Sequence, residues 1–221
     1  MDTVPPPARL AKDFLSVLDL GHDDLERLLA LAAEVKAHRH LGLRAPTAAA
    51  LADVMTMRER WGRTPGRIVA YVGDGNNVAT SLAHASCMAG ITVHVASPDG
   101  YELPDSVIEE ASRVARNGAR IRCFADPDEA VAGVNAIYTD VWASMGEESE
   151  ADKRRLVFTP YQVNSRLMSR AAPGAMFMHC LPAHRGEEVT AEVIESKASA
   201  VFDQAENRLH TQKALLLMLL G

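Results

Sequence analysis

The stretch IVAYVGDGNN at positions 68–77 decides the fold. Its first half, Ile68 to Val72, is a short β-branched apolar run typical of a buried strand, and its second half is rich in glycine and asparagine. The segment from Val78 to Ala89 reads as a helix. A buried strand that turns at once into a helix is the opening of a β-α-β unit, and such units build parallel sheets.

The turn between this strand and helix has two interpretations. It is either a binding loop or a tight turn whose glycines permit positive φ and whose Asn76 and Asn77 cap the helix. A dinucleotide-binding G-x-G-x-x-G loop would need glycine at position 78, where the sequence has Val78. We therefore expect no nicotinamide cofactor, and no other cofactor.

Strand-like and helix-like segments alternate after this unit. Further strands are expected at Thr92–Ala96, Arg120–Phe124, Ala136–Thr139, Ala175–His179 and Ala200–Phe202. Helices are expected between and after them, at Pro104–Arg116, Asp128–Ala132, Asn164–Arg170, Ala191–Glu195 and Glu206–Leu220. This alternation predicts an α/β protein with a Rossmann-like, doubly wound parallel sheet covered on both faces. Ligands of such folds bind beyond the carboxyl ends of the strands.

Two more helices are expected ahead of the sheet. Apolar side chains recur at helical spacing from Asp23 to His38 and from Thr47 to Arg60, and Thr47 is a suitable N-cap for the second helix.

Composition narrows the possible partners. The formal net charge is -6, and the longest block of Lys and Arg is the pair Arg154-Arg155, which argues against binding to nucleic acid or to an anionic membrane. The longest apolar run, Ala214 to Leu220, is far shorter than the roughly 20 residues of a membrane span. The first residues do not resemble a signal peptide, and three cysteines form no paired framework. We expect a cytoplasmic protein with a small-molecule ligand.

Two polar clusters follow predicted strands. The segment DVWASMG at 140–146 offers a carboxylate that can hold an ammonium group and turn backbone that can hold a carboxylate, although an Asp-capped loop is the other interpretation. The segment HCLPAHRGEE at 179–188 suggests zinc through His179, Cys180 and His184. No second cysteine pair or H-E-x-x-H helix supports that, so no metal is expected. A Cys-His hydrolase has as little support, and the thiol can equally be a small buried hydrophobe.

A third cluster, FDQAENR at 202–208, is expected to open the last helix. Arg208 would then lie in the first helical turn, where its charge opposes the helix dipole. That placement is reasonable if Arg208 faces an anion in a cleft, and the alternative is a surface arginine paired with Glu206 or another acid.

In their order and spacing, these motifs together resemble ornithine carbamoyltransferase. DGNN at 74–77, DVWASMG at 140–146, HCLP at 179–182 and ENR at 206–208 carry the resemblance over about residues 50–221.

Two further segments extend the resemblance and reveal a gap. KDFLSVLDL at 12–20 looks like the family's first segment, and ALADVMTMRE at 50–59 looks like the helix that leads into its second domain. In the family, a sheet domain with a phosphate-binding Ser-x-Arg-Thr motif and a carbamoyl-binding His-Pro-x-Gln motif lies between them. Neither motif occurs in this sequence.

The resemblance implies an ornithine site. Asn77 and the backbone at Met145 would bind the α-carboxylate of L-ornithine, and Asp140 and Ser144 would bind its α-amino group. Cys180, together with Asp140, would lie beside the δ-amino group that must lose a proton before it attacks a carbonyl carbon.

The resemblance also implies which residues remain of the carbamoyl-phosphate domain. The Leu181 carbonyl and Arg208 would meet carbamoyl phosphate, whose binding should be weak or lost. Residues 1–61 with 204–221 would form a helical remnant of the carbamoyl-phosphate domain, and residues 62–203 the ornithine-binding domain. Losing several preorganised donors, each worth roughly 10²–10³ in rate, should leave little activity.

Three functions therefore compete: an ornithine carbamoyltransferase, a non-catalytic module or remnant that binds ornithine, and a nicotinamide-linked enzyme, which Val78 disfavours.

Three expected helices would lie outside the sheet domain, at Asp23–His38, Thr47–Arg60 and Glu206–Leu220. Their apolar faces should bury one another or self-associate, and a homodimer is favoured over the family's usual trimer. The residues on those faces are Leu25, Leu28, Leu29, Val35, Leu51, Val54, Met55, Leu215, Leu216 and Met218.

Overall fold

A computed structural model describes residues 21–37, 49–143 and 150–220 of the 221-residue chain. The expected cap Thr47, the segment 12–20, Ser144 and Met145 lie outside the described residues.

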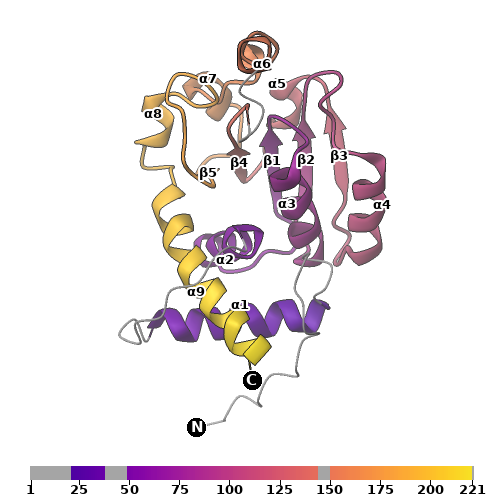
Figure 1. The fold of residues 1–221 in the computed structure, drawn as a ribbon, viewed down its shortest axis with the longest axis vertical. Helices are drawn as coiled ribbons and strands as arrows, with labels where there is room; N and C mark the ends of the chain where they lie inside the picture. Colours follow the sequence, from indigo (N-terminus) through magenta and orange to yellow (C-terminus); the bar gives the residue numbers. More distant parts are fainter. Residues whose placement is uncertain (1–20, 38–48, 144–149, 221) are drawn as a thin grey trace.

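The centre of the molecule is a five-stranded parallel sheet (Figure 1). Its strands are β1 (Ile68–Val72), β2 (Thr92–Ala96), β3 (Ile121–Phe124), β4 (Ala136–Thr139) and β5 (Met176–His179). Their order is β3-β2-β1-β4-β5, so the direction of winding reverses between β1 and β4. The register places Tyr71 between Val95 and Tyr138, which brings the carboxyl ends of β1 and β4 level.

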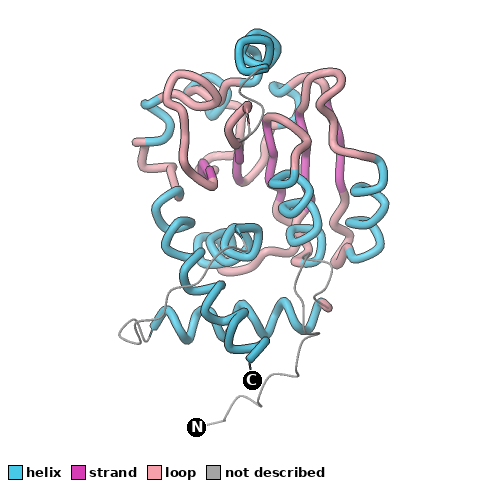
Figure 2. The backbone as a smooth tube through the Cα atoms, viewed as in Figure 1, coloured by secondary structure: helices cyan, strands magenta, loops and turns pink. Residues whose placement is uncertain are grey.

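Alternate residues of each buried strand supply the two faces of this sheet. On one face, Val69, Tyr71 and Tyr138 pack beneath α3 (Asn77–Met88) and α4 (Asp105–Val114). On the other, Ala70 and Ile137 join a second core. That core is covered by α5 (Pro127–Ala130), α6 (Ala151–Phe158), the short 3-10 helix η4 (Thr159–Tyr161), α7 (Ser165–Met168) and α8 (Ala191–Ile194). The predicted parallel sheet with helices on both faces is confirmed, and Figure 2 shows loops gathered at the edge nearest α6.

The three outer helices are α1 (His22–Ala37), α2 (Ala49–Trp61) and α9 (Val201–Leu220), and α9 packs against both others. Most of the apolar residues named for this layer are buried: Leu25, Leu28, Leu29, Leu51, Val54, Met55, Leu215 and Met218. Leu216 is 37% exposed, and the side chain of Val35 is not described. The layer is continuous with the core on the α3 face of the sheet. Both the domain division and the dimer stay predictions.

Two expectations about local structure are wrong, and one helix was missed. Val201 already lies in α9, so there is no strand at Ala200–Phe202 and the last helix does not begin at Glu206. The chain runs beside β5 only briefly, where the Phe177 N–H donates to the Ala198 carbonyl at 2.9 Å and the Ala200 N–H donates to the Phe177 carbonyl at 2.9 Å. Helix α6 was not predicted, because its sequence ADKRRLVF has no apolar stripe.

Among the described residues, no helix combines the length and apolarity that crossing a bilayer requires.

We expect the helical layer and the sheet to unfold together, because they share one apolar core. A Trp142→Phe variant leaves Trp61 on α2 as the only tryptophan, and Trp61→Phe leaves Trp142 beside the sheet. The two fluorescence transitions in urea should coincide. Leu28→Ala should shift both together, lowering the free energy of unfolding by about 2–5 kcal/mol.

Leu156→Ala is the matched control, because Leu156 is 81% exposed and its truncation should leave both transitions in place. Separate midpoints for the two tryptophans would contradict a single cooperative unit.

Candidate functional site

Polar residues from three segments meet where the winding of the sheet reverses, beyond the carboxyl ends of β1, β4 and β5. The first segment is the turn after β1. The Asn76 Oδ1 accepts hydrogen bonds from the backbone N–H groups of Val78 at 2.9 Å and Ala79 at 3.2 Å, so Asn76 is the N-cap of α3. Its Nδ2 donates to the Asp140 Oδ2 at 3.4 Å. Asn77 is the first residue of α3 and is exposed.

Gly75 allows this turn to lie against the chain that follows β2. A Cβ at position 75 would stand 2.5 Å from the carbonyl carbon of Glu102 and from the Leu103 nitrogen. The Gly75 N–H donates to the Tyr101 carbonyl at 2.8 Å. Of the two interpretations of the turn, the tight turn is confirmed in part, because Asn76 caps α3 whereas Asn77 is already its first residue. The binding role stays a prediction.

The centre of the site is a carboxylate and a thiol in direct contact. Asp140 follows β4 and is 6% exposed, and Cys180 follows β5 and is partly buried. The Cys180 Sγ donates to the Asp140 Oδ1 at 3.0 Å. Burial, and then the charge of Asp140, raise the pKa of the Cys180 thiol far above its ordinary value. The thiol is therefore neutral and a donor at physiological pH.

Two stacked tyrosines form the wall behind this pair. Tyr71 and Tyr138 lie on adjacent strands with ring centroids 5.7 Å apart. The Tyr71 hydroxyl donates to the Asn76 Oδ1 at 3.3 Å. Burial and the nearby Asp140 charge raise the pKa of Tyr71 well above its usual range, so this phenol stays neutral.

The loop after β5 is held by a buried pair. The His179 Nδ1 accepts from the Leu181 N–H at 2.9 Å, which leaves its Nε2–H to donate to the Glu188 Oε1 at 3.2 Å. The same Glu188 oxygen accepts from the His184 N–H at 2.6 Å. Leu181 has a φ of +58°, which only the fixed surroundings of the loop sustain.

The same hydrogen bonds disfavour a zinc site at His179. Ligand atoms of Asp140, His179 and Cys180 lie within 4.8 Å of one another, but both His179 nitrogens are engaged in hydrogen bonds. His184 groups with Glu187 and Glu188 instead. A metal at the first group would have to break the hydrogen bonds that shape the loop.

Arg208 reaches the site, but from a different position on its helix than expected. Helix α9 begins at Val201, so Arg208 lies in its third turn and the dipole argument for it is wrong. Its Nη1 donates to the Cys180 carbonyl at 3.1 Å. Glu206, the alternative partner, instead approaches His210 at 3.5 Å. Cys180, Leu181 and Arg208 are thus brought together.

Arg154 on α6 is a residue of this region that the sequence did not reveal. Its Nη1 donates to the Asp74 Oδ2 at 2.5 Å and to the Trp142 carbonyl at 2.8 Å. Its guanidinium also lies 5.0 Å from the centre of the Tyr101 ring. Arg154 therefore joins the turn after β1 to the segment after β4. Apart from the basic pair with Arg155, no sequence pattern indicates it.

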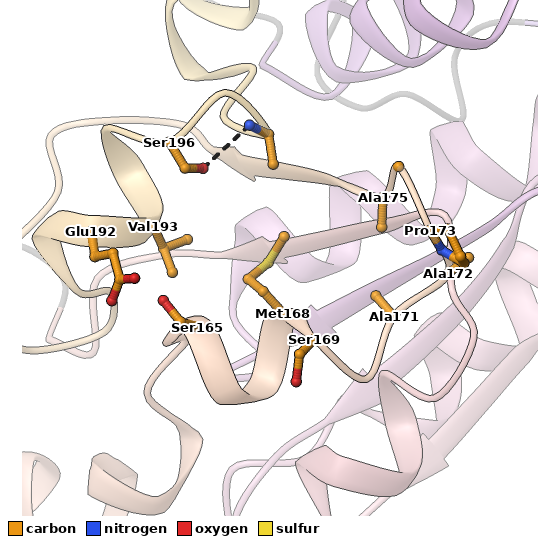
Figure 3. Close-up of a pocket in the computed structure, with 12 residues that line it drawn as sticks. Ser165, Met168, Ser169, Ala171, Ala172, Pro173, Ala175, Glu192, Val193 and Ser196 are labelled. Atoms are coloured by element: carbon orange, nitrogen blue, oxygen red, sulfur yellow. Dashed lines mark hydrogen bonds between the residues drawn. The ribbon is translucent and has the colours of Figure 1, made fainter.

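A separate depression of about 400 Å³ lies beside β5, between α7 and α8 (Figure 3). The loop Ala171–Ala175, which precedes β5, borders it together with Ser165 and Met168 of α7 and Val193 of α8. Neither Asp140 nor Cys180 lines this depression.

Comparison with known proteins agrees with this architecture. Residues 65–219 match the family described as aspartate/ornithine carbamoyltransferase, Asp/Orn binding domain. The chain is 48% identical to the ornithine carbamoyltransferase of Methanospirillum hungatei and 50% identical to that of Thermococcus kodakarensis. Both alignments cover the whole chain, and 72% and 71% of the respective relatives.

Solved structures give the same result. The ornithine carbamoyltransferase of Gloeobacter violaceus aligns with a TM-score of 0.86 at 32% identity, over 97% of this chain and all of that one. The enzyme of Pyrococcus furiosus aligns with a TM-score of 0.75 at 55% identity, over 78% of this chain and 56% of that one. A sheet of this topology, with these motifs at its switch point and these relatives, establishes that the chain belongs to the aspartate/ornithine carbamoyltransferase family.

Proposed function

We propose that this chain binds L-ornithine beyond β1, β4 and β5, in the manner of an ornithine carbamoyltransferase. The contact between Cys180 and Asp140 carries the proposal. A buried carboxylate whose neighbour is a neutral thiol has capacity left to accept hydrogen bonds from an ammonium group. The family and the relatives named above support ornithine as the source of that group.

The proposed arrangement uses both ends of the amino acid. Asn77, exposed at the start of α3, and the backbone at Met145 would bind the α-carboxylate, while Asp140 and Ser144 would bind the α-amino group. Cys180 would lie beside the δ-amino group. A diamine without the carboxylate would leave the segment at 144–146 without its ligand, so ornithine should be preferred over a diamine.

The reaction proposed for the family site is carbamoyl transfer. The neutral δ-amine attacks the carbonyl carbon of carbamoyl phosphate, the carbon–oxygen bond to phosphate breaks, and the amine loses a proton. The products are citrulline and inorganic phosphate. In this chain the Leu181 carbonyl and Arg208 would meet the carbamoyl phosphate, and Arg208 is already oriented by the Cys180 carbonyl.

Turnover by this chain alone should be slight. The Ser-x-Arg-Thr and His-Pro-x-Gln motifs are absent from its sequence, so most of the expected anion-binding groups are missing. Citrulline formation from ornithine and carbamoyl phosphate distinguishes an active transferase from a module that only binds ornithine.

Asp140→Asn should abolish ornithine binding measured by calorimetry, because the ammonium group loses its charged partner. The far-UV circular dichroism should not change. Asp105→Asn is the control, since Asp105 is an exposed carboxylate in the first turn of α4. Equal affinity in the Asp140 variant and the unmodified chain would refute the site assignment.

Carbamoyl phosphate alone should bind with a dissociation constant above roughly 1 mM, equivalent to less than about 4 kcal/mol. Arg208→Ala should weaken even this binding, which a titration followed by phosphorus NMR can measure. Micromolar binding at physiological salt would mean that other groups in the chain replace the missing motifs.

Arg154→Met should lower both the stability and the ornithine affinity of the chain. The Arg154–Asp74 pair is buried, with side chains 8% and 14% exposed, so its loss should cost on the order of 3 kcal/mol in thermal unfolding. Asp74→Asn in the same chain should recover part of that loss. The neighbouring Arg155→Met is the control, because Arg155 pairs with Glu187 and Asp152 on the surface. Equal effects of the two arginine variants would contradict the joining role of Arg154.

A further inference from the structure

Asp53 is a carboxyl group buried where a charge is costly. It lies on α2 and is 1% exposed. Its Oδ1 accepts from the Gln204 Nε2 at 2.7 Å, while its Oδ2 has no hydrogen-bond partner in the part of the chain that the structure describes. Burial raises the pKa of Asp53 to about 7, with hydrogen bonds from Gln204 and Tyr138 opposing the shift. Its protonation therefore changes near neutral pH.

Gln204 connects this carboxyl group to the ornithine site. Its Oε1 accepts from the His179 N–H at 3.0 Å, immediately before Cys180. Its Nε2 donates to Asp53 and, at 3.1 Å, to the Tyr138 hydroxyl. One amide on α9 thus holds α2, β4 and the end of β5 in a fixed relation.

Tyr138 completes the connection. Its hydroxyl lies beside both the Asp53 carboxyl and the Cys180 thiol, and hydrogen bonding from it lowers the pKa of each. A single hydroxyl hydrogen cannot serve both acceptors fully. The negative charge of Asp53 also raises the pKa of Cys180. The ionisation of Asp53 therefore acts on the thiol in two ways that have the same sign.

We propose that Asp53 is a positioning residue of the ornithine site, which acts through Gln204 and Tyr138 on the Cys180 thiol and its contact with Asp140. Asp53 itself touches no substrate in this arrangement. The proposal rests on the proposed role of Cys180, but it concerns the thiol and can be tested without substrate.

Packing alone does not require a carboxyl group at position 53. One turn further along the same interface, the Asn207 Nδ2 donates to the Thr56 Oγ1 at 3.0 Å and to the Glu59 Oε2 at 2.7 Å, so a neutral hydroxyl serves at position 56 itself. A neutral residue at 53 would avoid the desolvation of a charge. What distinguishes position 53 from position 56 is its connection to Cys180.

The ionisable groups that face this network come from three elements. Arg208 on α9 favours the charged form of Asp53, and Asp140 after β4 opposes it. The other two ionisable groups that face Asp53 are Tyr138 and Cys180. Burial raises the pKa of each, so both stay neutral. Of Asp53, Tyr138 and Cys180, Asp53 is the one whose protonation changes near pH 7.

Asp53→Asn should therefore make Cys180 react faster with iodoacetamide, and the effect should depend on pH. The test uses the full chain with Cys123→Ser, since Cys123 is exposed, and follows Cys180 by mass spectrometry. Below about pH 6 Asp53 is neutral in both proteins and the ratio of rates should be near one. Above about pH 8 the ratio should reach at least about threefold, with its midpoint near pH 7.

Buried Cys87 reports unfolding in the same experiment, because it should react only when the chain opens. Thr56→Val is the matched control: it alters the same helix interface and should give a Cys180 rate ratio that does not vary with pH. A ratio for Asp53→Asn that is near one at every pH, or is raised equally at every pH, would overturn the proposal.

Tyr138→Phe provides a second measurement if Asp53→Asn does not fold. It removes the hydroxyl that lowers the thiol pKa, so alkylation of Cys180 should become slower while Cys87 stays protected. An unchanged Cys180 rate would equally refute the connection. Either failure leaves ornithine binding by Asp140 untouched, so this proposal and the proposed function can fail separately.

Discussion

The level register of β1 and β4, across which the winding of the sheet reverses, is the constraint on which the rest of the site depends. Parallel strands present all their carboxyl ends at one edge, and helices leave that edge on opposite faces where the order reverses. Asn76, Asp140 and Cys180 follow β1, β4 and β5 and meet in the space between those faces. These residues come into contact because β1, β4 and β5 are neighbours in the sheet and end on the same side of it.

Groups outside the sheet then fix the loops that this edge leaves open. Arg154 joins the turn after β1 to the segment after β4, and Glu188 holds the loop after β5 through His179 and His184. Each is buried and makes more than one hydrogen bond, so each orients backbone as well as side chains. Preorganisation of this kind would suit the proposed ornithine site.

Much of the sheet was predictable because its strands are buried on both faces and read as continuous apolar runs. β1, β2 and β4 have the predicted limits. Ala200–Phe202 has the same local character, but only its first residue pairs with β5 before the chain turns helical. Helix α6 was missed because its sequence has no apolar residues recurring at helical spacing. Asp53 stands out in an apolar helix face, yet its partner Gln204 is 151 positions away and invisible without the fold.

Helix α9 runs without interruption from the carboxyl end of β5 to the helical layer formed with α1 and α2, so a rotation at one of its ends displaces the other. Its first half carries Gln204 and Arg208 at the site, and its second half buries Leu215 and Met218 against α1 and α2. Arg208 and Met218 are ten residues apart, or about 15 Å along a helix axis. A tilt of about 4° at the far end would displace the guanidinium by about 1 Å, enough to weaken its hydrogen bond to the Cys180 carbonyl. The alignment of Arg208 thus depends on hydrophobic packing well away from the guanidinium itself.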